Sequence, residues 1–276
     1  MHESLLVFRN FRYLKSSALL MALVTGFYLV HDPIGPPNGG TWLGYTLGVV
    51  GAALILWLMA YGVRKRSYQS SLGSVAGWLS AHVYLGLSLI VVATLHSGFQ
   101  FGLNVHTLTY VLMWAVIVSG VFGVYAYRRY PTLMTKSRRG KTLTAMMREI
   151  AEIDRECREI GVILSDEINR VLQRACDETR IGGSAWRQLS GQDPNCPTAL
   201  AHGQILRMAQ SASPEHALAN RRLLNLLGRK LDLLNRARRD VRFRALLDIW
   251  LYFHVPLAFA LLAALTAHVF AVLFYR

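Results

Sequence analysis

Four histidines lie inside apolar segments of the 276-residue chain, and they form two pairs with the same spacing. His82 and His96 lie fourteen residues apart in one segment, and His254 and His268 lie fourteen apart in another. Fourteen residues complete almost four helical turns, so both imidazoles of a pair lie on one face, about 21 Å apart along the axis. Imidazoles at two matched depths are suited to bind two haem irons, each between one histidine from either helix. We therefore expect the iron pairs His82/His254 and His96/His268.

These histidines could also have functions other than haem binding. A single histidine inside a membrane segment can hydrogen-bond a neighbouring helix or line a polar cavity. Because two segments repeat one spacing, we favour haem. Gly86 follows His82 by one turn on the same face, where a missing side chain would let a flat macrocycle approach the backbone. Close packing of helices is the alternative function of Gly86, and we expect it for Gly44, Gly48, Gly51, Gly120 and Gly123.

The two histidine segments belong to a set of five apolar blocks. The chain is 53% hydrophobic with a mean hydropathy of +0.30, yet its formal charge is +14. A nearly uncharged stretch of about 18 or more residues matches the ~30 Å hydrocarbon core of a membrane. The blocks are 16–31, 42–63, 75–97, 107–127 and 247–273. The first also suits a signal peptide, but no small-residue cleavage site follows it, so we expect an uncleaved helix.

The basic residues set the predicted orientation. Lys and Arg cluster before the first block, after the second and after the fourth, and they are absent from loops 32–41 and 98–106. Short basic loops stay in the cytoplasm, so we expect a cytoplasmic N-terminus and an outer C-terminus, in the plasma (inner) membrane of a bacterium. Segments 75–97 and 247–273 then run parallel, with His82 and His254 as the inner pair and His96 and His268 as the outer pair. Because topology accounts for the charge, we expect lipid and no nucleic acid as a partner.

The stretch between the fourth and fifth blocks has a different composition, rich in Arg, Glu, Leu and Ala. Residues 141–180 carry apolar side chains at helical spacing and predict one helix that ends at Gly182–Gly183. A short helix is expected near 198–211, and a long leucine-striped helix after Ser213–Pro214 that continues into the fifth block. We predict an all-α integral membrane protein with a haem-binding core of five transmembrane helices. Its domains are helices 1–4 (1–127), a cytoplasmic helical insert (128–246) and helix 5 (247–276).

Other residues with reactive or ligating side chains give weaker signals. Cys157, Cys176 and Cys196 form no C-x-x-C or C-x-x-C-H motif, so we expect reduced thiols without zinc, an iron–sulfur cluster or covalent haem. His31, Asp32 and His106 are predicted in outer polar loops. They are candidates for quinol binding or proton relay, and exposed loop histidines are the alternative that we favour.

One segment resembles a known family. "AHVYLGLSLIVVATLHSGF" (81–99) is similar to the haem-binding helix of ferric-reductase-like transmembrane domains, which carries a His, a Leu-Gly one turn later and an outer Leu-His. Here these are His82, Leu85–Gly86 and Leu95–His96. His254 and His268 fall where that family, and more distantly cytochrome b of quinol:cytochrome c complexes, places its other two ligands. The resemblance covers 42–127 and 247–273 and implies two bis-histidine b-type haems. The chain departs from ferric reductases in its insert and in having no Gly-rich phosphate loop for a nucleotide.

These observations lead to one expected function and one alternative. We expect a b-type di-haem cytochrome that transfers electrons across the membrane between a cytoplasmic-side redox partner and a quinone or outer-side acceptor. It would be the electron-transfer subunit of a membrane oxidoreductase, quinone- or ferric-reductase-like, as in a respiratory chain, and we assign no catalytic residue. An iron–sulfur or flavin protein is the expected partner, docked on an insert that could equally form an intra-chain bundle or a dimer contact. The alternative is a membrane sensor or scaffold with a histidine-bound metal and cytoplasmic signalling helices.

Overall fold

The computed structural model describes residues 5–67, 71–210 and 214–274, which divide into two compact units. Unit 1 contains residues 1–125 and 250–276, and unit 2 contains residues 126–249. The chain is 84% helical, and no strand occurs in the described ranges. Among the residues that the structure describes, five helices are long and apolar enough to cross a membrane. The predicted all-α fold with five candidate spans is therefore confirmed, whereas the haem-binding core and the cytoplasmic insert stay predictions.

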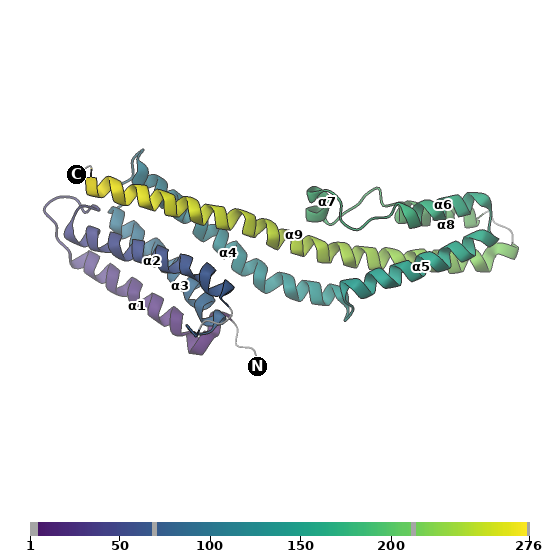
Figure 1. The fold of residues 1–276 in the computed structure, drawn as a ribbon, viewed down its shortest axis with the longest axis horizontal. Helices are drawn as coiled ribbons and strands as arrows, with labels where there is room; N and C mark the ends of the chain where they lie inside the picture. The colour runs from purple at the N-terminus through teal and green to yellow at the C-terminus, as the bar shows by residue number, and fades with distance from the viewer. Residues whose placement is uncertain (1–4, 68–70, 211–213, 275–276) are drawn as a thin grey trace. The chain divides into compact units, whose positions relative to one another are not determined.

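Unit 1 contains the helices that correspond to the five predicted spans (Figure 1). They are α1 (Phe8–Val30), α2 (Trp42–Arg66), α3 (Val75–Ser97), α4 (Val105–Arg138) up to Tyr125, and α9 (Ala217–Phe274) from Trp250; a short 3-10 helix, η1 (Leu5–Val7), precedes them. α1 begins earlier than the predicted block 16–31, although Arg9, Asn10 and Phe11 are left-handed, so its regular part starts at Arg12.

Unit 1 has apolar side chains both in its core and on its outer surface. α1 joins α2 and α3 through Val24, Leu43, Leu47, Val92 and Leu95, and the Ser17 hydroxyl donates to the Tyr84 carbonyl at 2.8 Å. Large apolar side chains also cover the outer surface, among them Leu29, Val49, Leu56, Phe122, Phe259 and Phe270. Exposed apolar area of this extent is typical of helices that lipid surrounds.

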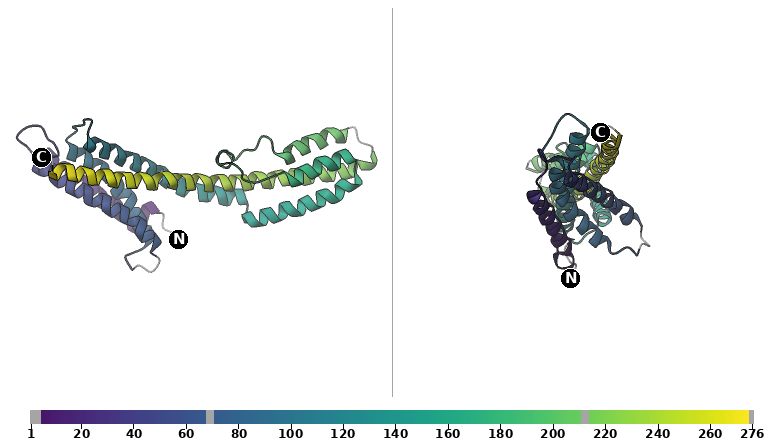
Figure 2. Two further views of the ribbon diagram at one scale, coloured as in Figure 1. Left: turned by 45° about the horizontal axis from the view of Figure 1, so that its top comes forward. Right: turned by 90° about the vertical axis from the view of Figure 1, so that its left-hand side faces the viewer.

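Unit 2 is a bundle of helices around one apolar core. Its helices are the end of α4, α5 (Leu143–Ile163), α6 (Asp166–Asp177), α7 (Ala185–Ser190), α8 (Pro197–Gln210), the short 3-10 helix η2 (Pro214–His216) and α9 up to Ile249. Within this unit α5, α6 and α8 lie along the first part of α9, as Figures 1 and 2 show. The core includes Met146, Ile153, Leu172, Ile205, Leu223, Leu227 and Leu234. The leucine stripe therefore packs inside this bundle. Of the predicted start at Ser213–Pro214, Ser213 lies outside the described residues, and α9 begins at Ala217.

The prediction of one helix over 141–180 is wrong. α5 ends at Ile163, and α6 begins at Asp166 after the N-cap residue Ser165, whose hydroxyl accepts from the Ile168 N–H. A serine followed by two acidic residues is a helix-start signal. The apolar spacing continues across the break because both helices pack on the same core. Gly182 and Gly183 come after α6 has already ended at Asp177.

The three cysteines of unit 2 are free thiols in the structure. Cys157 is fully buried, and burial raises its pKa to about 12. Burial likewise raises the pKa of Cys176 to about 11. Both thiols therefore stay protonated near neutral pH, in the form that is a poor nucleophile and a poor metal ligand.

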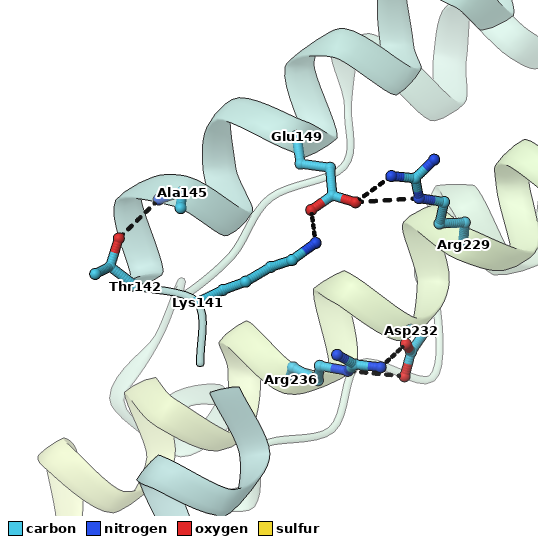
Figure 3. A network of polar contacts seen from close by, with 7 residues as sticks. All are labelled: Lys141, Thr142, Ala145, Glu149, Arg229, Asp232 and Arg236. Atoms are coloured by element: carbon cyan, nitrogen blue, oxygen red, sulfur yellow. Dashed lines mark hydrogen bonds and ion pairs between the residues drawn. The ribbon is translucent and has the colours of Figure 1, made fainter. Parts of the chain in front are cut away.

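A carboxylate between two cations ties α5 to α9 (Figure 3). Glu149 accepts from the Lys141 ammonium and, through Oε1, from Arg229 at 2.5 Å and 3.1 Å. The hydrogen bond from Lys141, followed by that from Arg229, lowers the pKa of Glu149 below its ordinary value. Asp232 and Arg236 form a separate pair one turn further along α9.

The Glu149 network predicts acid sensitivity. Its contribution is complete above the ordinary glutamate pKa of about 4.3 and is lost as the pH falls through the lower folded-state pKa. Glu149→Gln should lower the free energy of unfolding by up to about 1 kcal/mol near pH 7, and the difference from wild type should shrink as the solution is acidified. Denaturant unfolding of the detergent-solubilised chain, followed by circular dichroism, measures both effects. The control is Glu152→Gln on the same helix, because Glu152 has no ion pair among the described residues. An equal loss in the two variants would contradict the role of the network.

Candidate functional site

In unit 1 the structure brings the outer pair of predicted histidine partners into ring contact and the inner pair within electrostatic range. His96 of α3 and His268 of α9 have ring centroids 6.0 Å apart with planes at 77°. His82 of α3 and His254 of α9 are close enough to interact electrostatically. The two helices therefore place one pair of imidazoles at each of two levels, fourteen residues apart along both helices.

α2 supplies the hydrogen-bond partners of both histidines on α3. His82 Nδ1 lies 3.0 Å from the Leu58 carbonyl oxygen, and His96 Nδ1 lies 2.7 Å from that of Gly44. Leu58 and Gly44 are themselves fourteen residues apart on a helix that runs antiparallel to α3. A carbonyl oxygen only accepts, so Nδ1 of each imidazole carries the proton. Each Nε2 then holds a lone pair, which is the form that binds a metal.

α4 supplies the partner of His254. The Ser119 hydroxyl lies 2.6 Å from His254 Nδ1 and donates its single proton to the Val116 carbonyl at 2.9 Å. With its proton on the Val116 carbonyl, Ser119 Oγ accepts from Nδ1 of His254, and Nε2 is then unprotonated as on α3. Trp250 stacks on the His254 ring and donates from Nε1 to the Ser119 carbonyl at 2.7 Å. Gly123 makes room for that indole, because a Cβ there would lie 2.1 Å from Trp250 Cζ2.

His268 has a histidine as its partner. Its Nδ1 lies 2.5 Å from Nδ1 of His106, and the two ring centroids are 4.4 Å apart. The predicted loop position of His106 is wrong, because α4 begins one residue before it. If His268 donates as the other three histidines do, its Nε2 is available as well. His31 caps α1 and faces the Trp42 ring edge-on, and no hydrogen bond or ring contact joins it or Asp32 to the four histidines in the described ranges.

Glycines admit the His96 ring between α2 and α3. A Cβ on Gly48 would lie 2.7 Å from His96 Cε1, and one on Gly39 would lie 3.2 Å from it. Gly48 therefore serves a helix contact, as expected, and the group it contacts is the imidazole itself. A Cβ on Gly86 would meet nothing within 4 Å, so the space beside this predicted site residue is open.

An apolar layer lies between the two histidine levels. Ile55, Leu89, Met113, Leu261 and Leu265 are buried against one another, with contributions from α2, α3, α4 and α9. Leu89 and Leu261 each follow the inner histidine of their helix by seven residues, which is half the spacing of a pair. The levels are thus separate sites with a dry interior between them.

The residues that sequence reasoning missed are those around the imidazoles. They are Ser119 and Trp250, together with the carbonyl groups of Gly44 and Leu58. The sequence singles out His106 as a candidate, but not its contact with His268. Within the described ranges, no group of three or more His, Cys, Asp or Glu side chains is arranged to hold a metal ion. The histidines are arranged in pairs. Two protein ligands are the number that a bis-histidine haem needs, so a larger cluster is not required.

Two glycines on α2 test whether His96 needs the space it occupies. Gly48 lies four residues after Gly44, whose carbonyl contacts His96. Gly62 lies four residues after Leu58, whose carbonyl contacts His82. Gly48→Ala should lower the free energy of unfolding by about 1–3 kcal/mol, because the methyl group would displace the imidazole. Gly62→Ala should change it by at most about 0.5 kcal/mol, since a Cβ there meets nothing within 4 Å. Thermal unfolding in detergent compares them, and equal effects would show that Gly48 has no special role.

Comparison with known proteins leaves the chain without a matched relative. No family model, no curated protein and no solved structure matches it. The resemblance of segment 81–99 to ferric-reductase-like domains therefore stays a prediction, and the function is inferred from the chain's own residues.

Proposed function

We propose that the chain is a membrane-integral b-type cytochrome that holds two haems, one between His82 and His254 and one between His96 and His268. The observation that carries the proposal is the pairing of four imidazoles at two levels, each with its Nδ1 bonded to a neighbour. That pattern is typical of metal-binding histidines, whose second nitrogen donates to a carbonyl or another acceptor and so orients the ring.

The spacing of the outer pair fits this assignment. A metal ion held by one nitrogen of each ring, at about 2 Å from each, would set the two ring centres roughly 6 Å apart. The centroids of His96 and His268 are 6.0 Å apart. The open space at Gly86 also favours a flat macrocycle beside α3.

The two levels suit electron transfer across a membrane. Haem supplies one-electron redox chemistry, and the chain positions it and sets its potential through burial and imidazole hydrogen bonds. The inner pair would serve a cytoplasmic-side donor such as an iron–sulfur or flavin protein, and the outer pair a quinone or another outer-side acceptor. We place the protein in the plasma membrane of a bacterium, N-terminus inside, as an electron-transfer subunit of an oxidoreductase.

Histidine variants test the ligand assignment. The wild-type chain in detergent should be red and contain two b-type haems by reduced-minus-oxidised and pyridine haemochrome spectra. His82→Ala and His254→Ala should each remove the inner haem and largely spare the outer one, and His96→Ala and His268→Ala should do the reverse. His31→Ala is the control and should keep both. A colourless wild-type protein, or two haems in all four variants, would refute the assignment.

Ser119 tests the orientation of His254. Ser119→Ala removes the acceptor for Nδ1, so the inner haem should bind roughly 10- to 100-fold more weakly or change its midpoint potential. Ser119→Thr keeps a hydroxyl and should behave as wild type. Haem titration and a redox titration that resolves the two haems measure these changes. An inner haem that is equally tight and equipotential in the alanine variant would contradict the role of Ser119.

A further inference from the structure

Two antiparallel helices of unit 2 meet just outside the predicted spans 107–127 and 247–273. Tyr130 of α4 stacks on Phe243 of α9 with centroids 5.1 Å apart, and Arg239 Nε donates to Ser137 Oγ at 3.1 Å. Arg138 binds Asp240 through two hydrogen bonds of 2.6 Å and 2.9 Å. These contacts fix which residues of each helix face the other.

The basic residues next to this contact line divide between two sides. Successive residues of a helix are about 100° apart, so in an antiparallel pair the residues that precede the contact residues share one side. Arg129 precedes Tyr130, Arg242 precedes Phe243, and Lys136 precedes Ser137. The other side holds the residues that follow, among them Arg138, Asp240 and Arg244.

Both sides hold an acidic group, but among the described residues the one on the first side pairs only with Arg238, which precedes Arg239 and binds Asp193 at 2.9 Å. On the second side one acidic group binds two arginines. Asp240 is fully buried and binds Arg138 and, at 3.2 Å, Arg244. The pKa of Arg138 is raised, chiefly by its hydrogen bonds to Asp240, so the pair stays charged. Arg129, Lys136 and Arg242 are exposed, and none has an acidic partner in the part of the chain that the structure describes.

The unpaired arginines lie at the depth of lipid head groups. Arg129 is two residues beyond span 107–127 and Arg242 is five residues before span 247–273, about 3 Å and 8 Å along the helix axes. The head-group region on each side of a bilayer is about 5–8 Å thick. Tyr127, which is 59% exposed, precedes Arg129 at the level where tyrosines border a membrane.

We propose that Arg129 and Arg242 bind the phosphate of an anionic phospholipid, with Lys136 adding charge on the same side. Guanidinium groups bind phosphate oxygens with paired donors, and basic side chains next to a span attract anionic head groups. We choose lipid over an acidic protein because of the depth of the two arginines. The inference does not depend on haem and goes beyond the electron-transfer proposal.

Native mass spectrometry of the full chain tests the lipid site. Delipidated protein is titrated with phosphatidylglycerol and, separately, with phosphatidylcholine. Wild type should retain one phosphatidylglycerol in preference to phosphatidylcholine, and Arg129→Gln/Arg242→Gln should bind it roughly 30-fold more weakly. Arg129→Lys/Arg242→Lys should keep an intermediate affinity, because lysine keeps the positive charge but lacks the paired donors of a guanidinium group. Arg170→Gln/Arg207→Gln, which removes two exposed arginines of the bundle, is the charge-matched control and should behave as wild type.

Three outcomes would overturn the proposal. Equal retention of phosphatidylglycerol by wild type and the Arg129/Arg242 glutamine variant would exclude the site. An equal loss in the Arg170/Arg207 control would assign the effect to net charge alone. Poly-glutamate is titrated in parallel. Unchanged lipid binding by the Arg129/Arg242 glutamine variant, together with weaker binding of poly-glutamate, would indicate an acidic protein as the partner. Helicity by circular dichroism verifies that each variant is folded, and haem spectra, which should not change, separate this test from that of the electron-transfer proposal.

Discussion

A hydrogen bond at Nδ1 decides what a histidine can do inside a membrane helix. An imidazole N–H without a partner is unfavourable in hydrocarbon, so each ring turns toward an acceptor on a neighbouring helix. The carbonyls of Gly44 and Leu58 and the hydroxyl of Ser119 are those acceptors for His96, His82 and His254. The same hydrogen bonds place the proton on Nδ1 and leave a lone pair on Nε2. One contact therefore both satisfies the buried N–H and prepares the imidazole for the proposed metal binding.

The helices without proposed ligands are consequently as necessary as those that carry them. α2 runs antiparallel to α3 and offers its two carbonyls at the spacing of the histidines, and α4 offers Ser119 and His106 to α9. Glycines such as Gly48 bring the acceptor backbone close to the ring. Between the levels, Leu89 and Leu261 close an apolar layer. In this arrangement packing keeps the two histidine levels apart, and groups on α2 and α4 orient the imidazole rings.

The parts of this arrangement that repeat along one helix could be predicted from the sequence. The fourteen-residue spacing and the apolar blocks are local, so the five candidate spans and the pairing of histidines between α3 and α9 could be predicted. The acceptors could not, because every residue has a carbonyl group and only the register of two helices selects Gly44 and Leu58. Apolar spacing that continues across Ser165 hides the break there, and the helical position of His106 is hidden because α4 starts before its apolar block. Likewise, the charge of Arg129 and Arg242 is plain in sequence, but their common side follows from the stack of Tyr130 on Phe243.

An experimental structure of the purified protein, determined by electron cryomicroscopy in a lipid nanodisc, tests the central claim most directly. The account predicts two planar macrocycles between α3 and α9, with Nε2 of His82 and His254 on one iron and Nε2 of His96 and His268 on the other. It also predicts that the Nδ1 contacts to Leu58, Gly44 and Ser119 persist. A map with continuous side-chain packing between the imidazoles, or with Nε2 bonded to protein groups, would contradict it.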